Sequence, residues 1–323
     1  MAKLNLVEAI NLGLMQEMEK DSSVIILGED VGVDGGVFRV TDGLLKKFGS
    51  KRVIDTPLAE SGIVGVSIGM GIYGLKPVAE IQFEGFMMPA LDQLISHASR
   101  MRNRSRGRFS CPIVVRMPFG GKVRALEHHS DSPETYVVHT PGLKVVIPSR
   151  PYDAKGLIVS SIRDPDPVIF FEPKRIYRAI KEEVPEKEYS IPIGKAQIRR
   201  EGDDVTVISW GAMVRECEKA LDEMKVSAEL IDLRTLKPLD VSTIINSVKK
   251  TGRVVIVQEA QRTLGLASEI IALINDKALL SLEAPVERIT GFDTVVPLFQ
   301  LEDYYSPSVA RIKYGIERVV NYR

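Results

Sequence analysis

One glutamate, Glu60, stands alone in a long run that carries no other charge. In "DTPLAESGIVGVSIGMGIYGL" (residues 55–75) it is the single charged side chain between Asp55 and Lys76. A carboxylate desolvated by apolar neighbours favours its protonated form, so it can exchange a proton with a ligand nitrogen. The alternative is an acidic residue in a first helical turn, stabilised by the helix dipole after Thr56-Pro57. The local pattern leaves both interpretations open.

The same run contains two familiar patterns. Residues 65–69 satisfy G-x-S-x-G, the nucleophile elbow of α/β hydrolases, which requires a strand directly before Ser67. Residues 69–74 satisfy the dinucleotide pattern G-x-G-x-x-G, which must follow a strand and open a helix. Ser67 instead lies inside a helical pattern, and the glycines end that pattern. We favour a tightly packed buried helix with one stripe open to a close neighbour, formed by Leu58, Gly62, Gly65 and Gly69.

A histidine pair lies in "EHHSD" (127–131), beside two carboxylates. Adjacent residues of an extended segment point to opposite sides, and no HExxH or CxxC pattern accompanies the pair, so we expect no complete zinc site. The preceding residues, "PFGGKVRAL", are typical of a loop after a strand end, where open α/β sheets bind ligands. His128 or His129 is therefore a candidate general acid or base.

The composition narrows the class of function. The chain has 323 residues, enough for two domains, and its 43 Lys and Arg balance its 43 Asp and Glu. No global charge draws it to nucleic acid or to an anionic membrane, and the alternating arginines of 100–108 lack interleaved aromatic residues. The least charged run, 61–75, is too short and too rich in glycine to span a membrane.

The cysteines and the first residues of the sequence predict the compartment. Cys111 and Cys217 are too far apart for a CxxC motif, and "MAKLNLVEAI" has no cleavable apolar core. We therefore expect a cytoplasmic protein with two buried thiols.

Short β-branched runs alternate with helix-length segments, which predicts an α/β fold with two doubly wound domains. The domains are expected at 1–179 and 195–323, joined by a charged, proline-containing linker at 180–194. Strands are expected at 24–28, 52–56, 77–81, 112–116, 144–148, 167–172, 204–211, 228–234 and 253–260. Helices are expected at 6–19, 58–73, 88–103, 151–163, 213–225, 241–250, 266–276 and 307–321.

Several motifs in fixed order carry a resemblance that covers the whole chain. They are "LGEDVG" (27–32), "DTPLAESGIVG" (55–65), "EIQFEGF" (80–86), "HSDSPE" (129–134) and "PGLKVVIPSRPYDAKGL" (141–157). In these motifs the chain resembles the β subunit of the decarboxylating component of 2-oxo acid dehydrogenase complexes. The resemblance implies a thiamine-enzyme pyrimidine-binding domain followed by a transketolase C-terminal-like domain. It also implies oxidative decarboxylation of a 2-oxo acid with reductive acylation of a lipoyl group.

The resemblance assigns site residues. Glu60 would hydrogen-bond the pyrimidine nitrogen of thiamine diphosphate, and Phe86 would pack on that ring. Leu58, Gln82 and Glu29 would lie close to the cofactor. His129, which is followed by Ser130, would assist substrate protonation or lipoyl acylation. The family's structural monovalent cation, K⁺, would be held by main-chain oxygens of Ile113, Ser161, Asp164 and Asp166.

The resemblance also implies partners, because part of a thiamine site is missing. The G-D-G segment with a later asparagine that holds the diphosphate and Mg²⁺ has no counterpart, since 202–204 reads Gly-Asp-Asp. An α subunit would supply it in an α2β2 assembly, and the C-terminal domain would dock on a dihydrolipoyl acyltransferase core.

Two stretches, "MMPALDQ" (87–93) and "FFEPKRIYR" (170–178), resemble the branched-chain type more than the pyruvate type. Pro89 falls where some pyruvate-type sequences carry an acidic residue that links the two active sites. We therefore expect a branched-chain 2-oxo acid substrate, with a pyruvate or acetoin dehydrogenase β subunit as the alternative. A serine hydrolase or a non-catalytic scaffold is a more distant alternative.

Overall fold

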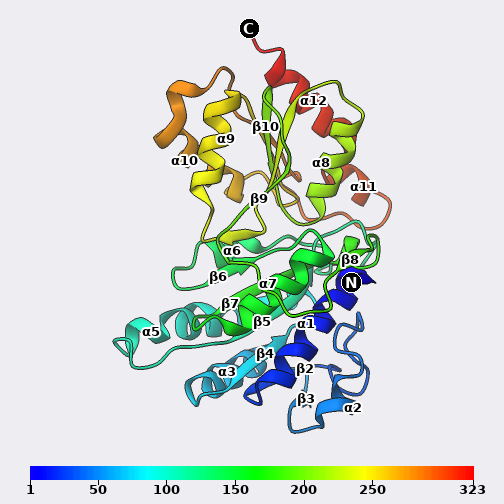
Figure 1. Cartoon of the computed structure of the whole chain (residues 1–323), viewed down its shortest axis with the longest axis vertical. Coiled ribbons are helices and arrows are strands. Elements are labelled where there is room, and N and C mark those ends of the chain that lie inside the picture. The colour runs from blue at the N-terminus through cyan, green and yellow to red at the C-terminus, as the bar shows by residue number, and fades with distance from the viewer. The chain divides into compact units, whose positions relative to one another are not determined.

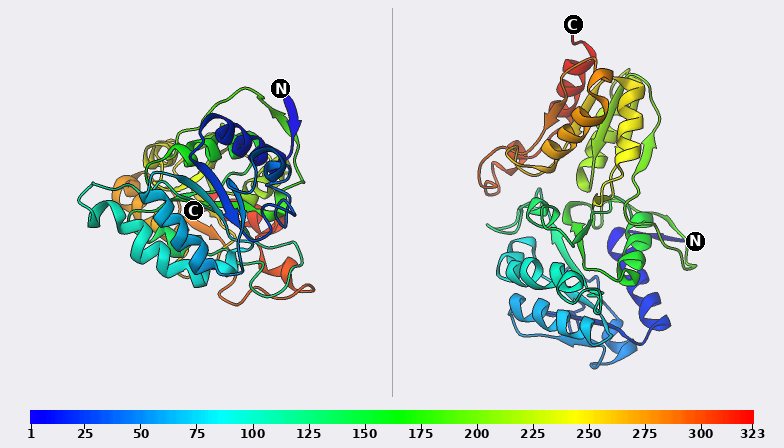
Figure 2. Two further views of the ribbon diagram at one scale, coloured as in Figure 1. Left: turned by 90° about the horizontal axis from the view of Figure 1, so that it is seen from below. Right: turned by 90° about the vertical axis from the view of Figure 1, so that its left-hand side faces the viewer.

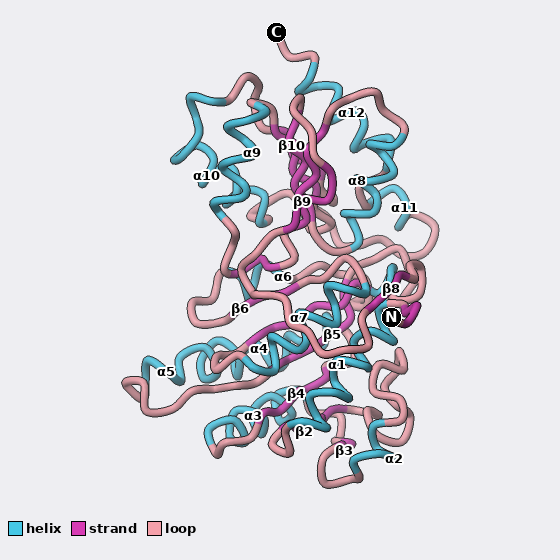
Figure 3. The backbone as a smooth tube through the Cα atoms, in the orientation of Figure 1, coloured by secondary structure: helices cyan, strands magenta, loops and turns pink.

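The chain, studied as a computed structural model that describes residues 1–323, divides into two compact units. Unit 1 comprises residues 1–119 and 136–193, and unit 2 comprises residues 120–135 and 194–323. Helices and strands alternate in both units (Figures 1 and 3), as the sequence predicts.

Unit 1 is built on a parallel sheet whose strands follow the order β6-β7-β5-β4-β2-β3. The strands are β-branched and almost wholly buried, as strands covered on both faces must be. Their bounds are β2 Val24–Gly28, β3 Val53–Asp55, β4 Lys76–Glu80, β5 Val114–Phe119, β6 Lys144–Val146 and β7 Val168–Pro173. Chain order reverses beside β2, because β3 pairs on one side of it and β4 on the other.

Helices cover both faces of this sheet. Helix α1 (Leu6–Lys20) packs on α7 (Pro151–Arg163), and α3 (Glu60–Ile72) packs on α4 (Met87–Asp92) on the opposite face (Figure 2). Asn5 caps α1 with a reciprocal bond to Glu8, and a proline begins α7. The remaining short helices are α2 (Leu44–Phe48), α5 (Met101–Arg104) and α6 (Glu134–Val138).

The predicted helix over 88–103 is wrong as a single element. Between α4 and α5 the chain forms a π-helical turn at Gln93–His97 and a 3-10 turn at Ala98–Arg100. The 3.6-residue pattern of this stretch therefore predicted that it is helical. It did not predict that the number of residues per turn changes along it.

Residues 180–193 of the predicted linker belong to unit 1, and Gly194 begins the second stretch of unit 2. Strand β8 (Glu182–Val184) pairs antiparallel with β1 (Ala2–Leu4). The buried Lys155 of α7 donates to the carbonyls of Pro185 and Lys187, the latter at 3.0 Å. Most charged side chains of the segment 180–193 are exposed to water, whereas its carbonyl groups bind Lys155. Composition alone therefore suggested a linker.

Unit 2 is a smaller sheet in the order β14-β13-β10-β11-β9, parallel except for β9. Helices α9 and α10 cover one face, and α8 and α12 cover the other (Figure 1). Its strands are β9 Gln197–Arg200, β10 Val205–Ser209, β11 Ala228–Asp232, β13 Val254–Val257 and β14 Glu287–Ile289. Strand β12 (Thr235–Lys237) also lies in this unit but is not a strand of this sheet. The helices are α8 Ala212–Asp222, α9 Val241–Thr251, α10 Leu266–Ala278, α11 Glu302–Tyr305 and α12 Val309–Val320.

The doubly wound α/β architecture predicted from the alternation is confirmed. Cys111 and Cys217 are both buried and unpaired, as expected, and burial raises the pKa of the Cys111 thiol to about 12. No helix is both long enough and apolar enough to cross a membrane.

Candidate active site

Two buried glutamates lie near the point where the strand order of unit 1 reverses. Glu29 directly follows β2, and Glu60 is the first residue of α3, which follows β3. Both are more than nine-tenths buried, with exposures of 7% and 8%. In open α/β sheets the crevice at the carboxyl ends of the strands, beside such a reversal, is the usual ligand site. The two interpretations of Glu60 therefore coexist: it is a first-turn residue, and it belongs to the candidate site.

The pair of Glu29 and Glu60 lacks a hydrogen-bond donor for one of its buried oxygens. The Oε1 atom of Glu29 is buried and has no hydrogen-bond partner. Burial raises the pKa of Glu29, and the nearby charge of Glu60 raises it further. A nitrogen donor placed against this oxygen would satisfy it, which is the chemistry that an aminopyrimidine offers.

The other predicted cofactor residues occupy the loops around the same edge of the sheet. Gln82, just beyond β4, donates from Nε2 to Asp30 Oδ2 at 2.9 Å. Phe86 ends a short 3-10 turn (η1, Glu84–Phe86), and its ring lies edge-on to Phe83 at 6.0 Å between centroids. Leu58 is 77% exposed, so within this chain it offers an open apolar surface.

The glycine stripe predicted on α3 is largely open within this chain, and only Gly65 approaches another element, where an added Cβ would lie 3.4 Å from Gln93 Oε1. A Cβ added at Gly69 would meet nothing within 4 Å, and Gly62 is exposed. Close packing occurs instead at Gly71, where a Cβ would lie 3.1 Å from Ile113. The prediction of a wholly buried helix is therefore wrong for one face, because the small residues of that face lie at the surface.

A buried ion network underlies the site. Arg116 on β5 donates from Nε and Nη2 to Glu172 on β7, at 2.6 and 2.8 Å, and from Nη1 to Glu80 on β4. Tyr177 donates its hydroxyl to Glu172 Oε2 at 2.6 Å. Burial raises the pKa of Glu80, while the neighbouring guanidinium opposes this effect. This network is not among the features predicted from the sequence, although a charged residue within each of three largely apolar strands is a detectable signal.

A second buried pair holds the aromatic segment that includes Phe86. Lys174 donates to both carboxylate oxygens of Glu84, at 2.7 and 2.6 Å, and both side chains are inaccessible to water. The same ammonium lies 5.5 Å from the centroid of the Phe83 ring. Since Glu84 is the first residue of η1, this pair fixes the turn on which the stacking residue lies.

The histidine pair belongs to unit 2. His129 is half-buried and donates from Nδ1 to the carbonyl of Glu127 at 2.7 Å, which makes Nε2 the basic nitrogen of the neutral ring. His128 is exposed, has a left-handed φ of 62°, and lies 3.9 Å from Asp131. The two rings therefore have different environments, and the assignment of the active one to His129 stays a prediction. No group of three or more acidic, cysteine or histidine side chains could hold a metal ion.

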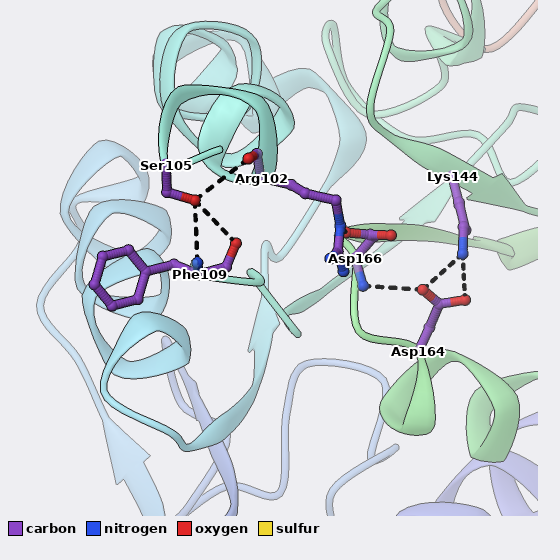
Figure 4. Close-up of polar contacts among 6 residues, drawn as sticks. All are labelled: Arg102, Ser105, Phe109, Lys144, Asp164 and Asp166. Carbon is purple, nitrogen blue, oxygen red and sulfur yellow. Dashed lines mark hydrogen bonds and ion pairs between the residues drawn. The ribbon is translucent and has the colours of Figure 1, made fainter. Parts of the chain in front are cut away.

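Three of the predicted cation ligands, Ser161, Asp164 and Asp166, lie close together in sequence, and the fourth, Ile113, lies on a neighbouring segment of unit 1. The carbonyl of Ile113 accepts from Val168 at 3.0 Å, and the carbonyl of Ser161 accepts from Asp164 at 3.3 Å. Figure 4 shows the two aspartate side chains bound to basic groups, Asp164 to Lys144 and Asp166 to Arg102. The carboxylates of both aspartates are thus paired with basic groups, and the cation site itself stays a prediction.

Ser67 is not placed as a hydrolase nucleophile. It lies within α3, is fully buried, and donates its hydroxyl to the carbonyl of Ile63 at 2.7 Å. The residues of the G-x-G-x-x-G pattern end the same helix and precede β4. Both patterns therefore occur in the wrong structural context, as the sequence predicts.

Comparison with known proteins decides the family. Residues 2–180 match the family described as "Transketolase, pyrimidine binding domain", and residues 194–312 match "Transketolase, C-terminal domain". The chain is 55% identical to the pyruvate dehydrogenase E1 component subunit beta of Acholeplasma laidlawii, with full coverage of both sequences. It is 53% identical to the subunit of the same name from Bacillus subtilis, covering 95% of this chain and 96% of the relative. The chain belongs to the E1 β subunits of 2-oxo acid dehydrogenases.

A solved structure supports the fold independently. The chain resembles a protein described as "Split gene transketolase, inactive beta4 tetramer" with a TM-score of 0.81, 18% identity and 99% coverage of both chains. The chain is thus part of a thiamine diphosphate-dependent decarboxylase component. The names of its relatives favour the pyruvate alternative over the branched-chain interpretation of "MMPALDQ" and "FFEPKRIYR".

The residues of this E1 β chain fit one part of that cofactor. Buried carboxylates at Glu29 and Glu60, an unsatisfied Oε1 atom, and the ring of Phe86 on the loop that follows the neighbouring strand β4 suit an aminopyrimidine. The chain lacks the G-D-G segment that would hold a diphosphate.

Proposed function

We propose that this chain acts with an α subunit in the oxidative decarboxylation of pyruvate, with reductive acylation of a lipoyl group. The supporting observation is the buried pair of Glu29 and Glu60 at the reversal of strand order, with one carboxylate oxygen unsatisfied. The full-length similarity to pyruvate dehydrogenase E1 β subunits supports pyruvate as the substrate. The branched-chain expectation rests only on two short stretches of sequence.

The residues of unit 1 would bind and protonate the pyrimidine end of the cofactor. Bound thiamine diphosphate supplies the electron sink that decarboxylation needs. Glu60 would hold a proton at its carboxyl and share it with the pyrimidine ring nitrogen, because its burial excludes competing water. Glu29 would accept from a cofactor nitrogen through Oε1, Phe86 would pack on the ring, and Gln82 and Leu58 would border it.

His129 would carry the second proton function. With Nδ1 donating to the Glu127 carbonyl, Nε2 is the nitrogen that can give or take a proton during substrate protonation or lipoyl acylation. The turn that holds Nδ1 therefore fixes the tautomer as well as the direction of the ring.

The α subunit would hold the diphosphate and Mg²⁺, completing the site in an α2β2 heterotetramer. This proposal rests on the missing G-D-G segment and on the β designation of the relatives. The C-terminal unit would dock on the dihydrolipoyl acyltransferase core. A K⁺ ion would bind main-chain oxygens of Ile113, Ser161, Asp164 and Asp166, whose segments adjoin through the hydrogen bond from Cys111 N to Pro165 O at 3.2 Å. The unpaired buried thiols support a cytoplasmic location.

Reconstitution tests the proposed function. The chain is co-purified with its α subunit and supplied with thiamine diphosphate, Mg²⁺, a lipoyl acceptor and either pyruvate or a branched-chain 2-oxo acid. We expect turnover only from the complex, with pyruvate the better substrate by kcat/KM. Turnover by the β chain alone would contradict the shared site, and a preference for branched substrates would restore the earlier expectation.

Substitution of Glu60 tests its role in the same complex. Glu60→Gln should abolish most decarboxylation while the heterotetramer still assembles, because the amide keeps the shape but cannot hold the transferable proton. Glu183→Gln, at an exposed position of β8, is the matched control and should behave like the unmodified chain. Near-normal activity of Glu60→Gln would refute the assignment.

A further inference from the structure

The segment 120–135, which carries His129, lies between elements of unit 1 in sequence but forms part of unit 2. It begins where β5 ends, and a hydrogen bond from Gly120 N to Asp131 O at 2.9 Å closes most of it into a loop. Up to Pro133 it contains no helix or strand, so its amide groups need acceptors from elsewhere.

Two glutamates from far along the sequence supply these acceptors. Glu259 Oε1 accepts from Gly121 N at 2.6 Å, although 138 residues separate them. Glu302 uses both oxygens: one accepts from Lys122 N, and the other accepts from Arg124 N at 2.9 Å. Both glutamates are buried, so these hydrogen bonds form in a water-poor setting.

The fit between the segment and the two carboxylates is tight. A Cβ added at Gly120 would lie 3.1 Å from Glu259 Oε2, and one added at Gly121 would lie 3.0 Å from Glu302 Oε1. Lys122 and Arg124 both have left-handed φ values, 59° and 55°, so each amide is turned by its backbone toward the acceptor it meets. The two glycines leave room for the carboxylates, and the left-handed backbone after them directs the amides toward the carboxylate oxygens.

The opposite end of the segment is also bound within unit 2. Trp210 donates from Nε1 to Glu134 Oε1 at 3.3 Å. Trp210 follows β10 and Glu259 lies just beyond β13, and these are the neighbouring strands at which the chain order of this sheet reverses. A doubly wound sheet ordinarily binds a ligand at such a reversal. Here the residues beyond β10 and β13 bind the segment 120–135 of the same chain.

We propose that Glu259 and Glu302 are positioning residues, which hold the segment 120–135 in place and so fix His129. This inference rests on the proposed function of His129. The ring itself is set by local bonds, from His129 N to Leu126 O at 3.1 Å and from Nδ1 to Glu127 O at 2.7 Å. The two glutamates instead anchor the turn from which those local bonds extend.

Limited trypsin digestion of the full chain tests the anchoring, because Lys122 and Arg124 are cleavage sites inside the segment. Glu302→Gln offers a single acceptor oxygen where two are used, so cleavage after these residues should accelerate on the order of 10-fold or more. Mass spectrometry of the new termini locates the cuts. Asp303→Asn, which removes only an exposed ion pair at 3.9 Å from Arg124, is the control and should leave the rate unchanged.

Gly121→Ala disturbs the same contact from the other side. Its added methyl group would meet both glutamates, at 3.0 Å and 3.4 Å, without removing either charge. It should accelerate cleavage as well, and it keeps the test available if Glu302→Gln does not fold. Unchanged cleavage in the folded variants would overturn the proposal.

Kinetics of the complex with the α subunit separate positioning from general stability. Both variants should lower kcat by about tenfold while KM for the 2-oxo acid changes little, because the substrate site itself is intact. Faster cleavage with unchanged kcat, while His129→Ala is inactive, would overturn the positioning role. If His129→Ala is fully active, the proposed function of His129 fails, and the digestion still decides whether the glutamates anchor the segment.

Discussion

Glu134 allows a quantitative prediction about stability and pH. It is 1% exposed, its Oε2 atom has no hydrogen-bond partner, and burial raises its pKa to about 8 from the ordinary 4.5. Between pH 5 and pH 8 the folded chain therefore keeps a proton that the unfolded chain has released. Stability from this group is full below the unfolded pKa and is lost as the pH rises toward the folded pKa.

The magnitude follows from the width of that window. Each pH unit lowers the free energy of unfolding by about 1.4 kcal/mol, which amounts to about 4 kcal/mol by pH 8. Glu134→Gln cannot ionise, while its carbonyl oxygen can still accept from Trp210. The variant should therefore gain stability relative to the unmodified chain by about 1.4 kcal/mol per pH unit between pH 5 and pH 8.

Urea unfolding of both chains at intervals from pH 5 to pH 8.5 measures this difference. The test is how the difference in free energy of unfolding between the two chains changes with pH. A constant cost of burying the amide would shift this difference equally at every pH and would leave its slope unchanged. Glu127→Gln removes an exposed carboxylate of the same segment and serves as the control, with no change of slope expected. A difference between Glu134→Gln and the unmodified chain that does not vary with pH would refute the reasoning.

Three further outcomes are expected. Arg116→Met should lower the free energy of unfolding by about 3–5 kcal/mol in urea, because Glu172 loses its buried partner; a loss below about 1 kcal/mol would show that the network contributes little. Lys174→Met should weaken thiamine diphosphate binding to the α-containing complex, measured by fluorescence titration, because the unpaired Glu84 would no longer hold the aromatic turn; unchanged affinity would contradict this. Ser67→Ala should leave decarboxylation intact, and a fluorophosphonate probe should not label the unmodified serine, whose hydroxyl bonds within its own helix; labelling at this residue would revive the hydrolase interpretation.

The fold was largely predictable because its signals are local. Buried parallel strands appear in the sequence as apolar runs, and Glu60 was expected in the first turn of a helix, where it lies. Glu29 was named only through the family resemblance. The segment 180–194 misled the prediction because its charges describe its exposed side only, whereas its carbonyls bind Lys155. The composition of a segment indicates whether its side chains are exposed to solvent. It does not predict the partners of the backbone hydrogen bonds.

The long-range part of the site could not be predicted from local pattern. Nothing near Gly121 in the sequence indicates that its amide meets a carboxylate 138 residues away. Arg116 and Glu172 are likewise joined only when β5 and β7 become neighbours, an order that the alternation of elements does not specify. Pairing across a sheet is a property of topology, and periodicity within one strand does not contain it.

The assignment of 120–135 to unit 2 has a consequence for any attempt to divide this protein. A fragment ending at residue 193 would contain the whole segment but neither Glu259 nor Glu302, so three amide groups would lose their acceptors. A fragment starting at 194 would retain both acidic side chains and lose the amides that donate hydrogen bonds to them. The N-terminal and C-terminal halves of the chain therefore cannot simply be exchanged between relatives. In a chimeric protein, residues 120–135 should come from the same relative as the C-terminal half.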